Sequence, residues 1–65
     1  MFIELHLLEN DEKIMLNINR INSIYQTKEA VYIYAGEVVY RVKESYEDIV
    51  ETIKKVIFNM SLTRR

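Results

Sequence analysis

The chain contains no cysteine, and this absence removes several classes of protein at once. Without cysteine there is no disulfide framework, which is the usual means of stabilising very small secreted domains. Zinc sites built on cysteine and catalytic thiols are excluded for the same reason. The sequence therefore favours a reducing compartment, and we expect the protein to be cytoplasmic.

Proline is also absent, and glycine occurs once, at Gly36. A disordered linker or a glycine-rich phosphate-binding loop needs more of these residues than the chain has. Hydrophobic residues make up 49% of the sequence, which is ample for a packed core. We therefore expect a single α+β domain over residues 1–60, followed by a basic C-terminal tail over residues 61–65.

The sequence also lacks a long apolar run and a charge excess. No run reaches the roughly 20 residues that span a bilayer, and no basic segment precedes an apolar one at the N-terminus, so we expect neither membrane insertion nor a signal peptide. Nine basic and ten acidic residues give a net charge of −1. Because proteins that mainly neutralise phosphates carry a clear basic excess, we do not expect nucleic acid to be the main partner.

Five segments alternate in side-chain character with the period of two that is typical of strands. They are expected at residues 2–8, 14–18, 21–26, 30–34 and 38–43. The connections between them are too short for parallel crossovers, which favours an antiparallel meander. A bend or bulge is expected near Asn19 and Arg20, because asparagine side chains compete for backbone hydrogen bonds. Gly36 is expected to supply the positive φ of the last hairpin turn.

After these strands, the spacing of apolar residues changes to that of a helix. Ser45 is expected to cap it, with Glu47 and Asp48 in the first turn and Lys54 and Lys55 late, as the helix dipole prefers. The apolar positions are Tyr46, Ile49, Val50, Ile53, Val56, Ile57 and Met60. The sequence therefore predicts an α+β fold: a five-stranded antiparallel β-meander, able to curve strongly, with one C-terminal amphipathic helix of roughly four turns.

No pattern of catalytic or ligand residues emerges from the sequence. His6 is the only histidine, and a zinc site needs three or four converging ligands, so a surface histidine near a sheet edge is the better interpretation. Glu47, Asp48 and Glu51 are explained by helix capping, and the acidic turn at residues 9–12 lacks the other ligands of a calcium loop. We therefore expect no catalytic residues, no cofactor, no metal and no small-molecule substrate, and the protein is predicted not to be an enzyme.

Aromatic and basic residues nevertheless include the ingredients for nucleic-acid binding, which combines phosphate contacts with ring stacking. Arg20, Arg41 and Lys43 are the residues that would make such contacts. The near-zero net charge keeps this as the minor alternative to a protein partner.

The sheet is expected to be apolar on both faces, although one helix can cover only one of them. The residues expected on the second face, as an interface, are Phe2, Met15, Tyr32, Tyr34 and Val39. Exposed aromatic and methionine patches of this kind mark association surfaces, so we expect a homo-oligomer or a protein partner. The alternative is a sheet that closes into a small barrel and hides part of this face.

Several of these residues also carry a family resemblance. They are Leu16, Asn17, Ile21, Ile24, Ile33, Gly36, Tyr40, the run Val42-Lys43-Glu44-Ser45, Glu47, Ile49 and Ile53. The chain resembles the FlbD family of short flagellar and swarming-motility proteins, and it is similar to small proteins carried by bacterial phages. The resemblance implies a non-enzymatic motility accessory protein that acts through protein contacts. The alternative is a phage-encoded small binder that occupies a host protein or nucleic acid.

Overall fold

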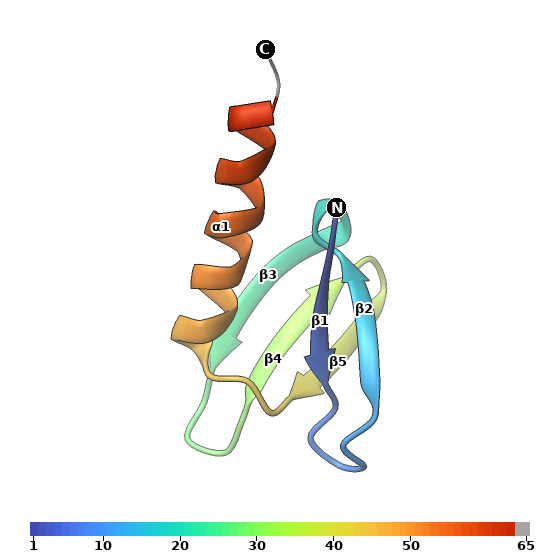
Figure 1. Cartoon of the computed structure of the whole chain (residues 1–65). Helices are drawn as coiled ribbons and strands as arrows, with labels where there is room; N and C mark the ends of the chain where they lie inside the picture. The colour runs from blue at the N-terminus through green and yellow to red at the C-terminus, as the bar shows by residue number, and fades with distance from the viewer. Residues whose placement is uncertain (64–65) are drawn as a thin grey trace.

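The computed structural model describes residues 1–63, with side chains as far as Asn59. It confirms the α+β class, with five antiparallel strands followed by one helix (Figure 1). The strands form two sheets, one of two strands and one of three. The elements are β1 (Phe2–His6), β2 (Lys13–Asn17), the 3-10 turn η1 (Ile18–Arg20), β3 (Ile21–Gln26), β4 (Val31–Ala35), β5 (Val38–Val42) and α1 (Tyr46–Thr63).

The first sheet is the β1–β2 hairpin, whose register places Ile3 opposite Leu16. Its loop closes through two backbone hydrogen bonds, from the Leu7 N–H to the Glu12 carbonyl and from the Asp11 N–H to the Leu7 carbonyl. Asp11 adopts a φ of 61°, which aspartate tolerates better than most residues. The polar turn expected at residues 9–12 is therefore confirmed.

The second sheet follows η1 and contains β3, β4 and β5 in chain order. The expected irregularity near residues 19–20 is present as the 3-10 turn, where the Asn17 side chain accepts a hydrogen bond from the Asn19 N–H, and the β3–β4 register shifts between Ile21 and Ser23. This break explains why β2 and β3 lie in separate sheets.

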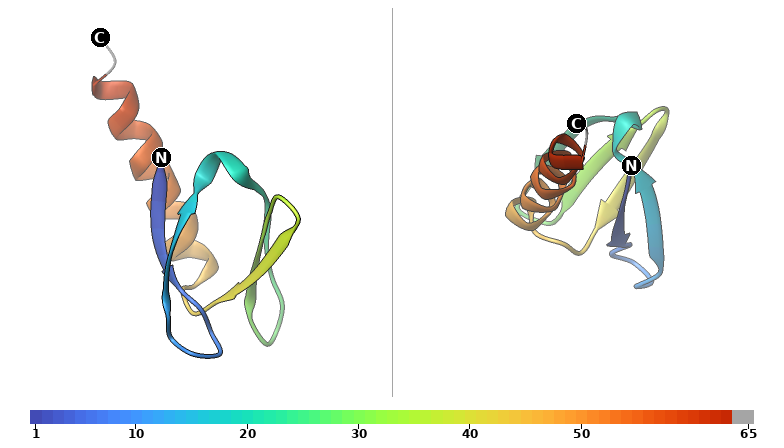
Figure 2. Two further views of the ribbon diagram at one scale, coloured as in Figure 1. Left: turned by 90° about the vertical axis from the view of Figure 1, so that its right-hand side faces the viewer. Right: turned by 45° about the horizontal axis from the view of Figure 1, so that its top comes forward.

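The β4–β5 hairpin turns at Gly36, with the predicted positive φ of 62°. The Gly36 N–H donates to the Arg20 carbonyl and to the Asn22 side-chain oxygen, so this turn is tied to η1 and to the start of β3. The two sheets also meet at the other end of β5, where Leu7 and Val42 form an isolated antiparallel bridge. The sheets therefore curve around one interior but do not close into a barrel (Figure 2).

The core lies between the sheets and the first half of α1. Its buried side chains are Ile3, Leu5, Leu16, Val31, Ile33, Ala35, Val42 and Ile49. Of the helix residues predicted to face the core, Ile49 is buried and Ile53 and Val56 pack at its edge, whereas Tyr46 and Ile57 are exposed. The core face of the helix is therefore narrower than the sequence predicted, and the side chain of Met60 lies outside the described residues.

The helix begins as expected after Ser45, whose hydroxyl accepts a hydrogen bond from the Asp48 N–H. It runs to Thr63 over 18 residues and projects past the sheets (Figure 1). Three of the five residues assigned to a tail, 61–63, are therefore helical, because the helix continues beyond the part that packs on the core. Arg64 and Arg65 lie outside the described residues.

Candidate functional site

Three tyrosine rings form a cluster on the outer face of the β3–β4–β5 sheet. Tyr25 and Tyr32 are cross-strand partners, and their rings stack with centroids 5.3 Å apart. Tyr34 lies two residues along β4 on the same face, with its ring centroid 5.5 Å from that of Tyr25. The hydroxyls of Tyr25 and Tyr34 are hydrogen-bonded at 3.2 Å, and this bond is the main reason that the pKa of Tyr25 is raised. The three rings therefore pack against one another on this face.

The same face continues onto β5. The register sets Val39 opposite Tyr34 and Arg41 opposite Tyr32, so both residues share the outer face with the tyrosines. The Val39 side chain is exposed, as are those of Tyr25 and Tyr34. We call Tyr25, Tyr32, Tyr34 and Val39 the outer patch. The exposure of Val39, Tyr25 and Tyr34 shows that this part of the face is open to solvent.

The structure places the five residues predicted as an interface in two separate groups. Tyr32, Tyr34 and Val39 lie together in the outer patch. Phe2 and Met15 lie on the β1–β2 hairpin, with exposed fractions of 56% and 61%. All five lie outside the core, but they occupy two different sheets.

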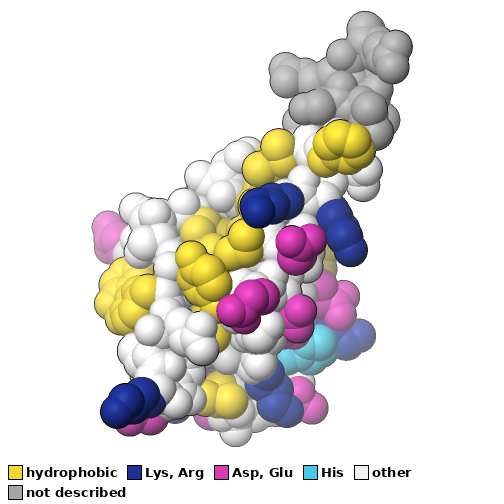
Figure 3. Space-filling model, turned by 90° about the vertical axis from the view of Figure 1, so that its left-hand side faces the viewer, with side chains coloured by type: hydrophobic (Ala, Val, Ile, Leu, Met, Phe, Trp, Pro, Cys, Tyr) yellow, Lys and Arg dark blue, Asp and Glu magenta, His cyan; other side chains and the backbone are white. Residues whose placement is uncertain are grey.

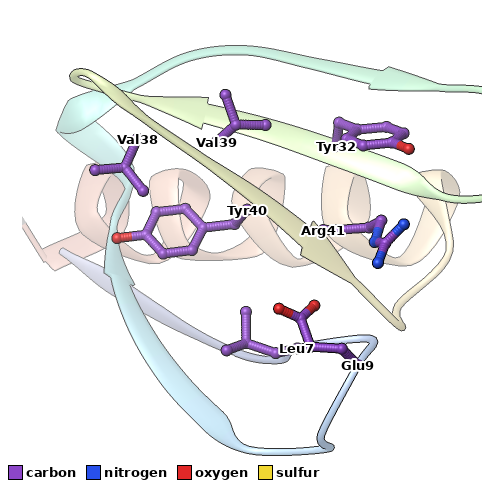
Figure 4. Close-up of a pocket in the computed structure, with 7 residues that line it drawn as sticks. All are labelled: Leu7, Glu9, Tyr32, Val38, Val39, Tyr40 and Arg41. Atoms are coloured by element: carbon purple, nitrogen blue, oxygen red, sulfur yellow. The ribbon is translucent and has the colours of Figure 1, made fainter.

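An open groove runs between the hairpin loop and β5. It has a volume of about 360 Å³ and is lined by Leu7, Glu9, Tyr32, Val38, Val39, Tyr40 and Arg41. In Figure 4 Leu7 and Glu9 come from the chain after β1, on one side, and Tyr40 and Arg41 come from β5, on the other. A second hollow near the other end of β5 includes Phe2, Met15, Val38 and Tyr40. Val38 and Tyr40 therefore lie between the two halves of the predicted interface.

Val38 lies on the inward side of β5 but is not part of the core. Val38 lies opposite Ala35, so its side chain is on the inward side of the sheet, as the period of two predicted. That side chain is nevertheless 49% exposed. The reason is that the two sheets do not close at this end of β5, so the inward side opens into the groove.

The basic residues predicted for nucleic-acid contact do not converge. Arg41 lies on the outer face beside Tyr32, whereas Arg20 ends η1 near Gly36. Lys43 is paired with Asp11 across 3.0 Å, and this hydrogen bond is the main reason that the pKa of Asp11 is lowered. Arg20 therefore lies apart from the other two residues, whereas Arg41 and Lys43 lie two residues apart at the end of β5.

His6 has a structural partner that the sequence did not reveal. Its Nδ1 lies 2.7 Å from an oxygen of Glu44, and its backbone N–H donates to the other oxygen of that carboxylate. Partial burial of Glu44 opposes its ionisation, but the hydrogen bonds with His6 outweigh burial and lower the pKa of Glu44. The pair ties the end of β1 to the chain between β5 and α1. Among the described residues, no group of three potential metal ligands gathers around it or elsewhere.

All four residues of the Val42-Lys43-Glu44-Ser45 run hold this junction together. Val42 is buried and bridges Leu7, and the Lys43 N–H donates to the His6 carbonyl. Glu44 binds His6, and Ser45 caps the helix. This run, which carries part of the family resemblance, therefore has a structural role in this chain.

The solvent side of the helix differs from the outer patch. Figure 3 shows acidic and basic side chains along it, with hydrophobic side chains beside them and near its far end. Ile57 and Phe58 are exposed there. No helix in the described part of the chain is long and apolar enough to cross a membrane.

Sequence reasoning missed Tyr25 and Val38 as surface residues. The short connection at residues 27–30 is the signal that could have identified Tyr25 as a surface residue. A hairpin there pairs Gln26 with Val31 and so places Tyr25 opposite Tyr32. The exposure of Val38 could not have been predicted from the sequence, because it depends on the distance between the two sheets.

No protein-family model matches the sequence, and no curated protein or solved structure matches it. The resemblance to the FlbD family therefore stays a prediction.

Proposed function

We propose that this chain is a small non-enzymatic protein-interaction module that binds its partner through the outer patch. The observation that supports the proposal is the tyrosine cluster, which is ordered by stacking and a hydrogen bond although it is exposed. Tyrosine is enriched at protein interfaces because its ring buries a large area while its hydroxyl stays hydrogen-bonded. Rings that are already fixed also lose little conformational entropy on binding.

A protein fits this surface better than a nucleic acid does. Single-stranded nucleic acids are bound by aromatic platforms that lie in a positively charged groove. Here Arg41 is beside the tyrosines, but Arg20 is elsewhere and Lys43 is engaged by Asp11, and the chain has a net charge of −1. A second copy of the chain is one protein that could occupy the patch, in a homo-oligomer.

The resemblance to the FlbD family supports a cytoplasmic motility accessory protein as the cellular role of this module. The phage-encoded binder is the alternative role, and it uses the same surface. The neighbouring genes distinguish the two cellular roles, because flagellar motor genes nearby support the first role and phage structural or early genes support the second.

The proposal is tested by capture of partners from lysate at about 150 mM salt, near physiological ionic strength. The expected result is that the wild-type chain captures a specific protein or a second copy, whereas Tyr34→Glu does not, because the new charge is placed in the patch. Tyr46→Glu is the matched control, since Tyr46 is a tyrosine of equal exposure, 37%, at the start of the helix.

The same proteins are titrated with single-stranded DNA and RNA. Affinity that rests on a few basic residues falls steeply with salt, because phosphate contacts release counterions. We expect weak and sequence-independent binding at that salt. Nanomolar binding with a strong sequence preference would contradict the proposal, and Arg20, Arg41 and Lys43 would then be the first residues to mutate.

A further inference from the structure

The outer edge of β5 is partly paired and partly open. The Leu8 N–H donates to the Arg41 carbonyl, and the Lys43 N–H donates to the His6 carbonyl, both at 2.9 Å. Around the Leu7–Val42 bridge, residues 6–8 therefore act as a short antiparallel strand against β5. The edge of β5 already accepts an extended backbone at this end.

The pairing stops where the chain turns away after Leu8. Asp11 bonds back to the Leu7 carbonyl, and its positive φ directs the chain toward β2. Opposite residues 38–40, no strand in the described part of the chain continues the ladder. An unfinished ladder therefore faces the open groove.

The direction of the unpaired groups follows from the register. In an antiparallel sheet, successive residues point their backbone groups alternately to the two neighbouring strands. Arg41 points toward residues 6–8, so Val39, two positions earlier, points its N–H and carbonyl to the same outer edge. The groove beside them is lined by Leu7, Val38 and Tyr40.

We propose that an extended segment of a partner protein adds to β5 as a fourth strand of this sheet, pairing its backbone with Val39. The inference rests on the proposed function, since it states how the partner reaches the outer patch. Side chains of an added strand alternate between two faces. One set contacts Val39, Arg41 and the tyrosines, and the other enters the groove. Strand addition is a common mode of peptide recognition.

The segment is short and its chemistry is restricted. The open stretch of β5 is limited to residues 38–40 and is bordered by the loop after β1, so we expect one extended chain to pair with it. The groove is apolar apart from Glu9 and Arg41 at its sides. We therefore expect a segment with apolar residues at alternate positions and without proline at the residues that pair with β5.

The probe is a displayed library of random 12-residue peptides, selected against the full chain. Individual peptides that bind are then resynthesised with a methyl group on one backbone nitrogen at a time. Only strand addition predicts one sensitive backbone nitrogen: a methyl on the nitrogen that faces Val39 weakens binding by about tenfold, as expected for one lost hydrogen bond, and methyls on the two neighbouring nitrogens have little effect. Peptides that dock by side chains alone would show no such single sensitive nitrogen.

Two variants of the protein complement the peptide scan. Val39→Pro removes the outward N–H, whereas Val39→Thr keeps it and has a similar shape. We expect Val39→Pro to weaken peptide binding much more than Val39→Thr does, because only the proline removes the backbone hydrogen bond, with folding checked by circular dichroism. If Val39→Pro does not fold, the N-methyl scan of the peptides alone supports or overturns strand addition.

The outcomes separate this inference from the proposed function. Peptides that are insensitive to methylation but lost on Tyr34→Glu would overturn strand addition and leave the outer patch supported. Peptides that show the one sensitive nitrogen yet ignore Tyr34→Glu would support strand addition and count against the outer patch. If no peptide binds and the Val39 amide becomes protected from hydrogen exchange as protein concentration rises, the occupant is a second copy and the partner segment is wrong.

Discussion

The two faces of the β3–β4–β5 sheet are built from alternate residues of the same strands, yet they differ in almost every physical respect. On the inner face, Val31 and Ile33 of β4 are buried against the other sheet and the helix. On the outer face, Tyr32 and Tyr34 of the same strand lie beside Tyr25, where Tyr34 and Tyr25 are exposed and Tyr32 is half-buried. Strand alternation thus separates the residues that hold the fold from those available for binding.

A pair of substitutions on β4 gives the largest expected contrast. Ile33→Ala leaves a cavity at a side chain that is fully buried, and it should lower the free energy of unfolding by about 2–5 kcal/mol. Tyr34→Glu, next to it on the opposite face, should cost less than about 1.5 kcal/mol, because it loses one exposed hydrogen bond and partial ring contacts. Denaturant melting measures both, and equal losses would show that the outer patch also holds the fold.

The helix allows the same comparison along its length. Ile53 packs at the edge of the core, so Ile53→Ala should cost about 1–2 kcal/mol, roughly half of a full burial. Ile57, one turn later, is exposed, and Ile57→Ala should stay within about 0.5 kcal/mol. Thermal melting of the two variants checks where the packed part of the helix ends. A large loss at Ile57 would mean that another surface covers it, such as a second copy.

A smaller effect than that of the core substitutions is expected at the His6–Glu44 pair. Glu44→Gln should lower stability by about 1 kcal/mol at pH 7, the size of a partly exposed charged hydrogen bond. Because folding lowers the pKa of Glu44, its ionised form stabilises the fold above the ordinary glutamate pKa of about 4.3. This contribution is lost as pH falls through the lowered pKa of the folded state.

Melting curves between about pH 3 and pH 7 measure this difference. The wild type and Glu44→Gln should converge at the acid end, whereas Glu4→Gln, an exposed position on β1, should follow the wild type throughout. A difference between wild type and Glu44→Gln that does not change with pH would contradict the role given to the carboxylate.

Local patterns predicted more of the fold than of the site. The period of two located all five strands, and Gly36, Asn19 and Ser45 marked a turn, a break and a cap, because each of these features is decided by neighbouring residues. The sequence did not show that the strands divide into two sheets. That division depends on how far η1 turns the chain, and it determines the exposure of Val38.

Long-range pairs were also beyond sequence reasoning. His6 and Glu44 are 38 residues apart, and no local signal relates them. The end of the helix was placed too early because charge and capping signals mark where a helix starts more clearly than where it stops. Phe2 and Met15 were correctly placed outside the core, but their separation from the tyrosines required the sheet arrangement.

The central claim, that the outer patch is where a protein is bound, is tested most directly by photo-crosslinking in the native cell. Benzoylphenylalanine is placed at position 34 in one variant and at position 46 in another, so that a reactive ring replaces a tyrosine of the same exposure on each surface. The account predicts a protein adduct of defined mass from position 34 and none from position 46. Equal adducts from both positions, or adducts to nucleic acid alone, would contradict it.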